Sequence, residues 1–365
     1  MKKIPGSYIL DIYIIKKFLG TFFFAIAMLM FITVIFDLSE KLDEFLTNKA
    51  PIKAIVFDYF LNFIPYFAAL IAPLFTFIAV IFFTSRMAYN TEIIAILSSG
   101  VSFRRLLVPY FVSALVIVLL NIYLNNFIIP HSNMERFIFE EKYYHSGPQT
   151  FNEKNVHKQV EPGVFVYLES YSTANDYGRK FSMEKIKDGK LLSKLMSQDI
   201  RWDSAIKKWT IRNYMIRDYA DGKQTITTGE SLDTTLNMSP EEFRMRKNAI
   251  EALDYYELNQ FIETQRLQGA TNMSALLVEK NRRFAVPFST FILTLIGVSV
   301  SSRKVRGGIG MHIAIGLLLS SSYILFMKFS SEFAISGSLP PLLASWLPNI
   351  IYAFIALFMY KIAPK

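Results

Sequence analysis

Four basic residues near the ends of apolar runs could bind phosphate groups: Lys41, Arg282, Arg283 and Lys328. At about 1.5 Å per helical residue, Lys41 and Lys328 lie at a similar height, roughly 30–35 Å from where their runs begin. Arg282 and Arg283 precede a later run at the same expected level. Lysine attracts phosphate as a point charge, and arginine can bind it through two parallel hydrogen bonds. Together the four cations could ring a cavity mouth and hold the phosphates of a lipid headgroup.

A second interpretation stays open for each of these cations. A long basic side chain beside an apolar run often extends along that run until its charge reaches the lipid headgroups. Lys328 could also pair with Glu332, four residues later on the same helix. The known excess of basic residues belongs to the cytoplasmic side, and these four are expected on the other side. That position favours a binding role for at least one of them.

A polar stretch at residues 86–105, RMAYNTEIIAILSSGVSFRR, separates two apolar runs. The residues from Glu92 to Leu97 favour a short helix, and Gly100 is a typical residue after a helix end. Short loops rich in Lys and Arg stay in the cytoplasm. A small amphipathic helix held there between two membrane spans suits the docking of a cytoplasmic partner.

The composition is that of an integral membrane protein. The 365 residues are 52% hydrophobic, with 33 Phe, and the apolar residues come in long runs. The formal net charge of +9 does not favour nucleic acid as a partner, because many cations flank apolar runs, where membrane topology explains them. Cysteine is absent, which excludes disulfides and thiolate metal sites.

Six apolar runs are long enough to cross a bilayer. We place them at roughly 19–36, 54–83, 106–129, 284–301, 309–330 and 342–360. Pro65 and Pro73 predict a kinked second span, and Pro130 is expected to end the third. The amphipathic segment 7–18 is expected to be an interfacial entry helix. Gly316 and Ser320 predict close helix packing in the fifth span, which could be a static contact or a seam that opens.

The basic clusters agree on one orientation. They are Lys16-Lys17, Arg86 with Arg104-Arg105, Arg303-Lys304-Arg306, and Lys361 with Lys365. All of them fall on one side of a six-span arrangement. Both termini are therefore expected in the cytoplasm, and the segment between the third and fourth spans on the opposite, periplasmic side.

That segment, about 150 residues long, is large enough to be a domain. Residues 164–171 and 208–219 have the composition and alternation of strands, and Asp188-Gly189 and Asp221-Gly222 are hairpin turn signals. Strand signals are weak between Ser172 and Leu195, so the strand count stays open. We expect an antiparallel β-sandwich or jelly-roll-like module. A helical return segment at 240–268 should pack through Leu253, Leu258, Phe261, Ile262 and Leu267.

The predicted fold class is an integral membrane α-helical bundle with an inserted periplasmic all-β, jelly-roll-like domain. Three transmembrane helices precede the insert and three follow it. The expected domains are an N-terminal membrane block at 1–130, the periplasmic domain with its helical return at 131–280, and a C-terminal membrane block at 281–365.

Motifs of catalysis are absent from the sequence. No GxxxxGK[ST] phosphate loop occurs, and the glycines at 307, 308 and 310 lack the Lys-Ser/Thr that would hold phosphate and magnesium. No HExxH pair and no GxSxG nucleophile turn is present. We therefore expect no catalytic residues, no metal site, no bound cofactor and no enzymatic activity.

Three stretches resemble recurring stretches of a known family. They are LDIYIIKKFLGTF, TEIIAILSSGVSFRRLL and VEKNRRFAVPFSTFILTLIGVSVSSRK. Together with the layout of three spans, a β-rich insert and three spans, they make the whole chain resemble the LptF/LptG permeases of the lipopolysaccharide export system. Whether the chain is closer to LptF or to LptG stays open.

This resemblance implies an inner-membrane transport subunit that works with partners. LptF pairs with LptG on a dimer of the ATPase LptB, which uses the ATP, and the periplasmic jelly roll passes lipopolysaccharide to an LptC/LptA-type bridge. The first and fifth spans form lateral gates, and basic residues near the top of the first span, matched here by Lys41, hold the lipid. The loop between the second and third spans is the coupling helix, here about 86–100. Its candidate contacts to the ATPase are Arg86, Glu92, Ala95, Gly100 and Arg104.

Energetics agree with that role, because extracting an acyl chain costs about 0.8 kcal/mol per CH₂ and needs an outside source of work. Two other classes stay open. One is the permease of a different ABC system, for lipoprotein release or amphiphile efflux. The other is a membrane scaffold or sensor that transports nothing.

Overall fold

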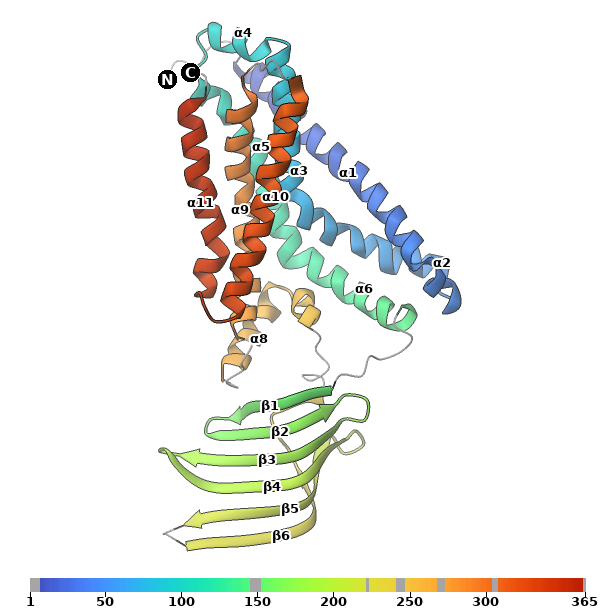
Figure 1. Cartoon of the computed structure of the whole chain (residues 1–365). Helices are drawn as coiled ribbons and strands as arrows, with labels where there is room; N and C mark the ends of the chain where they lie inside the picture. The colour runs from blue at the N-terminus through green and yellow to red at the C-terminus, as the bar shows by residue number, and fades with distance from the viewer. Residues whose placement is uncertain are drawn as a thin grey trace. The chain divides into compact units, whose positions relative to one another are not determined.

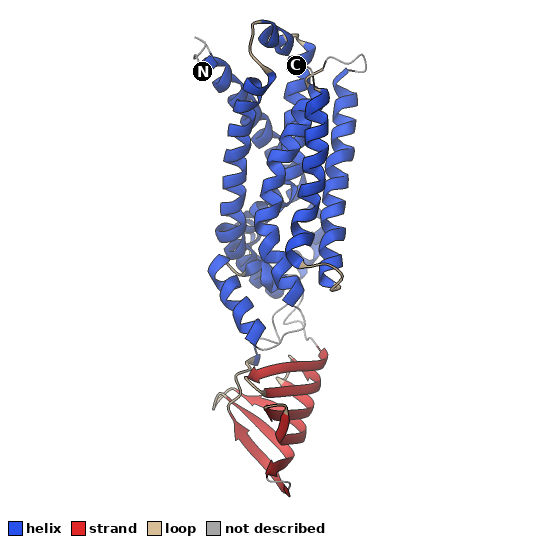
Figure 2. Cartoon of the chain, turned by 90° about the vertical axis from the view of Figure 1, so that its left-hand side faces the viewer, coloured by secondary structure: helices blue, strands red, loops and turns tan. Residues whose placement is uncertain are grey.

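The computed structural model describes residues 7–144, 152–220, 223–240, 247–267, 273–303 and 308–363. These residues form two compact units. One unit comprises residues 1–136 and 274–365 and is helical, and the other comprises residues 137–273 and contains the sheet (Figures 1 and 2). The chain thus leaves the helical unit once and returns to it once.

Among the described residues, six helical segments are long and apolar enough to cross a membrane, as predicted. The helices that compose them, with the short α4, are α1 (Ser7–Thr47), α2 (Ile52–Ala54), η1 (Ile55–Phe60), α3 (Leu61–Tyr89), α4 (Glu92–Ser98), α5 (Phe103–Tyr123), η2 (Leu124–Ile128), α6 (Ile129–Tyr143), α9 (Met273–Ser301), α10 (Gly308–Ile335) and α11 (Pro341–Ile362). The prediction of three spans on each side of an insert is confirmed.

Helix α3 is central to the bundle and packs against both α1 and α10. Phe83 of α3 stacks on Tyr110 of α5 at a ring distance of 5.3 Å and lies 5.7 Å from the ring of Phe18 in α1. Further along α3, Phe77 belongs to a second buried cluster with Tyr323 of α10. Burial of such large apolar side chains stabilises each helix pair by about 1.5–3 kcal/mol per residue in water, and in lipid the same contacts act mainly through packing.

Two predictions about helix boundaries were wrong. Helix α1 runs without a break from Ser7 to Thr47, so no separate entry helix precedes the first span. The third span continues through Pro130, because α5, η2 and α6 follow one another directly. A proline breaks a helix by removing a donor and crowding the preceding turn. Here the π-helical segment η2 lies just before Pro130, and its wider turn changes which backbone N–H and C=O groups pair.

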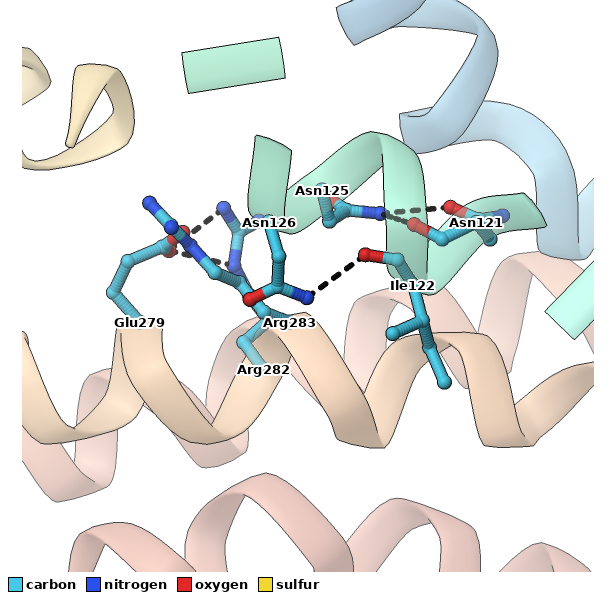
Figure 3. A network of polar contacts seen from close by, with 7 residues as sticks. All are labelled: Asn121, Ile122, Asn125, Asn126, Glu279, Arg282 and Arg283. Atoms are coloured by element: carbon cyan, nitrogen blue, oxygen red, sulfur yellow. Dashed lines mark hydrogen bonds and ion pairs between the residues drawn. The ribbon is translucent and has the colours of Figure 1, made fainter. Parts of the chain in front are cut away.

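Two asparagine side chains of η2 donate hydrogen bonds to backbone oxygens of the preceding turn (Figure 3). The Asn125 amide nitrogen donates to the backbone oxygen of Asn121 at 2.8 Å. The Asn126 amide donates to the backbone oxygen of Ile122, also at 2.8 Å. Extra donors of this kind allow an irregular turn within a membrane helix.

Proline also lies inside the second span. A π-helical segment, η1, precedes α3, and α3 contains Pro65 and Pro73. Figure 1 shows the chain changing direction between α2 and the later part of α3, as the prediction of a kinked span requires.

The second unit contains one six-stranded antiparallel sheet whose strands are neighbours in chain order. The strands are β1 (Asn152–Glu161), β2 (Val164–Ser172), β3 (Tyr177–Lys187), β4 (Lys190–Asp203), β5 (Lys208–Ala220) and β6 (Lys223–Thr234). The prediction of an inserted antiparallel β domain is confirmed. The described residues form six strands in one sheet, rather than the two packed sheets of the expected sandwich or jelly roll. Successive hairpins in a single sheet account for this order, as in a meander.

Turn chemistry and one buried face explain the register of the sheet. Asp188 and Gly189 join β3 to β4 with φ of 50° and 73°, as the predicted two-residue hairpin turn requires. The other predicted turn, Asp221-Gly222, lies outside the described residues. Trp209 is fully buried and donates its indole N–H to the backbone oxygen of Met238 at 2.8 Å. One face of the sheet therefore holds the domain core.

The return segment contains η3 (Lys247–Ala252) and α8 (Tyr255–Leu267). Helix α8 begins with a reciprocal cap. Asp254 Oδ1 accepts the Glu257 N–H at 2.8 Å, and Glu257 Oε2 accepts the Asp254 N–H at 3.0 Å. Leu258 and Ile262 are buried as predicted, but Leu267 is exposed, because it lies in the last turn of the helix.

Candidate functional site

The predicted docking helix exists as α4, between α3 and α5. Left-handed backbone conformations at Thr91, with φ of 62°, and at Gly100, with φ of 88°, turn the chain on either side of it. Ile93 is fully buried in the bundle core and anchors the helix, while Ile94 and Ala95 are exposed. Figure 1 shows α4 at the same end of the bundle as both chain termini. Its outward face is thus free for a partner.

Glu92, the predicted polar contact of this helix, has partners within the chain. Its carboxylate accepts a hydrogen bond from the Tyr13 hydroxyl at 3.0 Å and one from the Asn90 side-chain amide at 3.4 Å. Tyr13 belongs to α1, so this bond links α4 directly to the first span. Glu92 is only half-buried, which leaves part of its carboxylate accessible.

The basic residues at the α4 end of the bundle differ in their partners. Arg105 forms a two-pronged ion pair with Asp11 of α1, with nitrogen–oxygen distances of 2.8 and 2.5 Å. Arg104 donates from Nε to the Tyr360 hydroxyl of α11 at 3.1 Å. Arg86 is exposed at the end of α3. The starts of α1 and α5 are therefore held together, while Arg104 and Arg86 face outward.

Lys41 lies in a compact polar cluster between α1 and η1. Its ammonium forms an ion pair with Asp37 at 2.9 Å and donates to the Tyr59 hydroxyl, which itself donates to Asp37 at 2.8 Å. The side chains of Lys41 and Asp37 are only 15% and 14% exposed, so little of this charge faces the surroundings. A ligand phosphate would have to compete with the Asp37 carboxylate for Lys41.

Arg282 and Arg283 share one carboxylate, Glu279, on α9 (Figure 3). Arg282 Nε donates to Glu279 Oε2 at 2.9 Å and Arg283 Nε to Oε1 at 3.2 Å. The Arg283 side chain is 4% exposed and that of Arg282 is 33% exposed. Arg282 is therefore the more accessible of the two arginines.

Lys328 is exposed on α10 between the exposed side chains of Leu325 and Phe329. Within the described part of the chain it forms no hydrogen bond or ion pair, so the alternative pairing with Glu332 does not occur. Of the four predicted cations, Lys328 has the charge that is most available to a ligand.

The side chains that pair with the functional candidates were not predicted from the sequence. Asp37 and Glu279 each lie four residues before a predicted cation, and this helical spacing could have identified them. Tyr59 and Tyr13 come from distant positions and give no such signal. Arg136 was also missed; it is buried, and its guanidinium carbon lies 5.0 Å from the centre of the Tyr66 ring.

Small residues allow the close packing of α3 with two neighbouring helices. A Cβ added at Gly316 of α10 would lie 2.5 Å from Ile81 Cδ1, and one at Gly297 of α9 would lie 2.8 Å from Val80 Cγ1. The close helix approach expected around Gly316 is therefore present.

The chain matches one known protein family over most of its length. Residues 12–362 match the family described as lipopolysaccharide export system permease LptF/LptG. The match includes both membrane blocks and the β insert. No curated protein matches the chain.

Proposed function

We propose that this chain, which belongs to the LptF/LptG family of lipopolysaccharide export system permeases, is the permease subunit of an ABC transporter. In this function it extracts lipopolysaccharide from the inner membrane and passes it to a periplasmic LptC/LptA-type bridge. The observation that carries the proposal is the family match from residue 12 to residue 362. A match to one membrane block alone would not connect the spans to the β insert.

The proposed orientation places α4 and both termini in the cytoplasm and the β domain in the periplasm. Exposed Lys16, Lys17 and Arg86 lie on segments of the α4 end, and such residues are retained on the cytoplasmic side. Lys304, Arg306 and Lys365 of the predicted clusters lie outside the described residues. This orientation puts the docking helix on the side where ATP is available.

The proposed partner at α4 is an LptB-type ATPase dimer. Ile94 and Ala95 provide an exposed apolar surface, and Arg86, Glu92, Gly100 and Arg104 are its proposed surroundings. The bond from Glu92 to Tyr13 supports a path by which a movement of α4 reaches α1. ATP hydrolysis belongs to the partner in this proposal, and this chain holds no cofactor.

The proposed lipid path uses α1 and α10. Within the most apolar stretch of each helix, the buried share is only 17% in α1 and 28% in α10, compared with 61% in α9. Their uncovered apolar faces suit lipid chains or a paralogous permease, LptF with LptG. Lys328 and Arg282 are the more exposed of the proposed headgroup contacts, while Arg282, Arg283 and Lys41 each already pair with a carboxylate.

Purification of the tagged chain in mild detergent, with mass spectrometry of bound proteins and lipids, tests this function. We expect an ATPase, a second six-span permease and lipopolysaccharide. An ATPase with lipoproteins instead would assign the chain to a lipoprotein-releasing system. Absence of both an ATPase and a lipid would contradict transport and favour a scaffold.

A further inference from the structure

A groove lies on the outer face of the bundle between α5 and α9, distinct from the proposed lipid path along α1 and α10. Its volume is about 470 Å³, within the range of sites that hold small ligands. The lining consists of one basic and six apolar residues: Arg104, Leu107, Val108, Phe111, Val112, Leu115 and Phe291.

The groove follows one stripe of α5. Residues 104, 108, 112 and 115 repeat at intervals of three or four and therefore share one face of the helix. Phe111 and Phe291 stack across α5 and α9, with ring centres 6.2 Å apart. The distance along the helix from Arg104 to Leu115 is about 16 Å, which is close to half of a hydrocarbon core of about 30 Å. The groove thus extends along the helix for about the thickness of one leaflet.

Charge is confined to one end of the groove. Arg104 is exposed there, and Nε donates to the Tyr360 hydroxyl at 3.1 Å. Its two terminal nitrogens form no hydrogen bond or ion pair within the described residues, whereas the adjacent Arg105 is paired with Asp11. Arginine can bind phosphate with both terminal nitrogens, and the Tyr360 hydroxyl, which accepts from Arg104 Nε, keeps its own proton to donate.

We propose that this groove binds one glycerophospholipid with an anionic headgroup. The phosphate lies at Arg104 and Tyr360, and an acyl chain lies along Val108, Val112 and Leu115. The apolar lining favours a lipid over a soluble anion, and one cation at the end of a groove of about 470 Å³ suits one phosphate and one acyl chain. The site goes beyond the proposed transport function; it shares Arg104 with the surface proposed for the ATPase, and the test below therefore uses the chain without that partner.

Native mass spectrometry of the purified chain, titrated with phosphatidylglycerol or phosphatidylcholine, tests the proposal. We expect saturable binding of one phosphatidylglycerol, about tenfold tighter than phosphatidylcholine, and a loss of about tenfold in Arg104→Gln. Leu115→Trp should fill the groove and remove the binding. Val116→Trp alters an exposed neighbour outside the groove, and Lys16→Gln removes an exposed cation from another helix, so both should bind normally.

Three results would overturn the proposal. The first is equal binding of both lipids by the unaltered chain. The second is an equal effect of Leu115→Trp and Val116→Trp, which would mean that the groove has no special role. The third is protection of the groove by a second permease chain, seen as loss of Leu115→Cys labelling with a lipophilic maleimide only in the assembled complex. Transport activity enters none of these readouts, so failure here leaves the proposed function untouched.

Discussion

Single residues differ mainly in whether another side chain already neutralises their charge. Lys41 is held by Asp37 and Tyr59, whereas Lys328 is exposed among apolar side chains. Pairing reduces the free energy that a cation can gain from a phosphate, because the existing ion pair must first be broken. The two lysines should therefore respond differently to the same substitution.

Lys328→Gln should reduce crosslinking of lipopolysaccharide to the chain without lowering Tm, because no internal partner loses a bond. Lys41→Gln should lower Tm, since it leaves the Asp37 carboxylate largely buried without its cation, at a cost of about 1–3 kcal/mol. Thermal unfolding in detergent and photo-crosslinking measure the two effects. Asp37→Asn with Lys41→Gln is the matched control and should recover Tm; a further drop would refute this account of the pair.

Substitutions at Tyr13 and Glu92 should separate two proposed roles of α4: contact with the ATPase, and transmission of its movement to α1. Glu92→Arg should weaken association with the ATPase, because it reverses the charge at the proposed surface. Tyr13→Phe removes only the hydrogen bond from α1, worth about 0.5–1.5 kcal/mol, and should preserve association but lower lipid release per ATP hydrolysed. Co-purification and a transport assay measure these effects. Normal recovery of the ATPase with Glu92→Arg would exclude a direct contact.

At the scale of helices, glycines allow α3 to approach its neighbours closely. Helix α3 contacts α9 at Gly297 and α10 at Gly316, and it also packs on α1. The close contacts place α3 beside the helices of both membrane blocks. Added side-chain volume at either glycine must therefore shift the facing side chain of α3 or the helix itself.

Gly297→Leu should lower Tm and the yield of folded protein, because its Cβ alone would lie 2.8 Å from Val80 and 3.1 Å from Phe77. Overpacking of this kind costs about 1–3 kcal/mol. Size-exclusion chromatography and thermal unfolding are the measurements. Gly20→Leu on α1 is the matched control, since no atom lies within 4 Å of a Cβ there. Equal behaviour of the two variants would show that the α3–α9 contact tolerates added volume.

The whole molecule consists of a helical unit and a β-rich unit joined by two passages of the chain. The proposed orientation puts α4 and the β-sheet on opposite sides of the membrane. The complete absence of cysteine makes this orientation open to direct measurement.

Single cysteines at Ser98 and Lys190 should label from opposite sides of the inner membrane. Both positions are exposed, Ser98 in α4 and Lys190 at the β3–β4 turn. A maleimide that cannot cross the inner membrane should label Lys190→Cys in cells with a permeable outer membrane. It should label Ser98→Cys only after the inner membrane is disrupted. The reverse pattern would invert the proposed topology and remove α4 from contact with a cytoplasmic ATPase.

Local sequence determined the six spans, the position of α4 and the all-β character of the insert. Hydropathy, helix stop signals and hairpin turns act over a few to about 20 residues, so each can be recognised without knowledge of its neighbours. The same reasoning failed at Pro130, because a π-helical segment, η2, lies just before this proline and the helix continues past it.

Tertiary structure alone decided which charged residues are paired and which remain available. Tyr13 meets Glu92 across 79 positions, and Asp11 meets Arg105 across 94. Arg104 meets Tyr360 across 256 positions, and only this packing places a cation at the end of an apolar groove. Such contacts depend on how helices pack, and many side chains along each helix contribute to that packing. No short stretch of sequence encodes it.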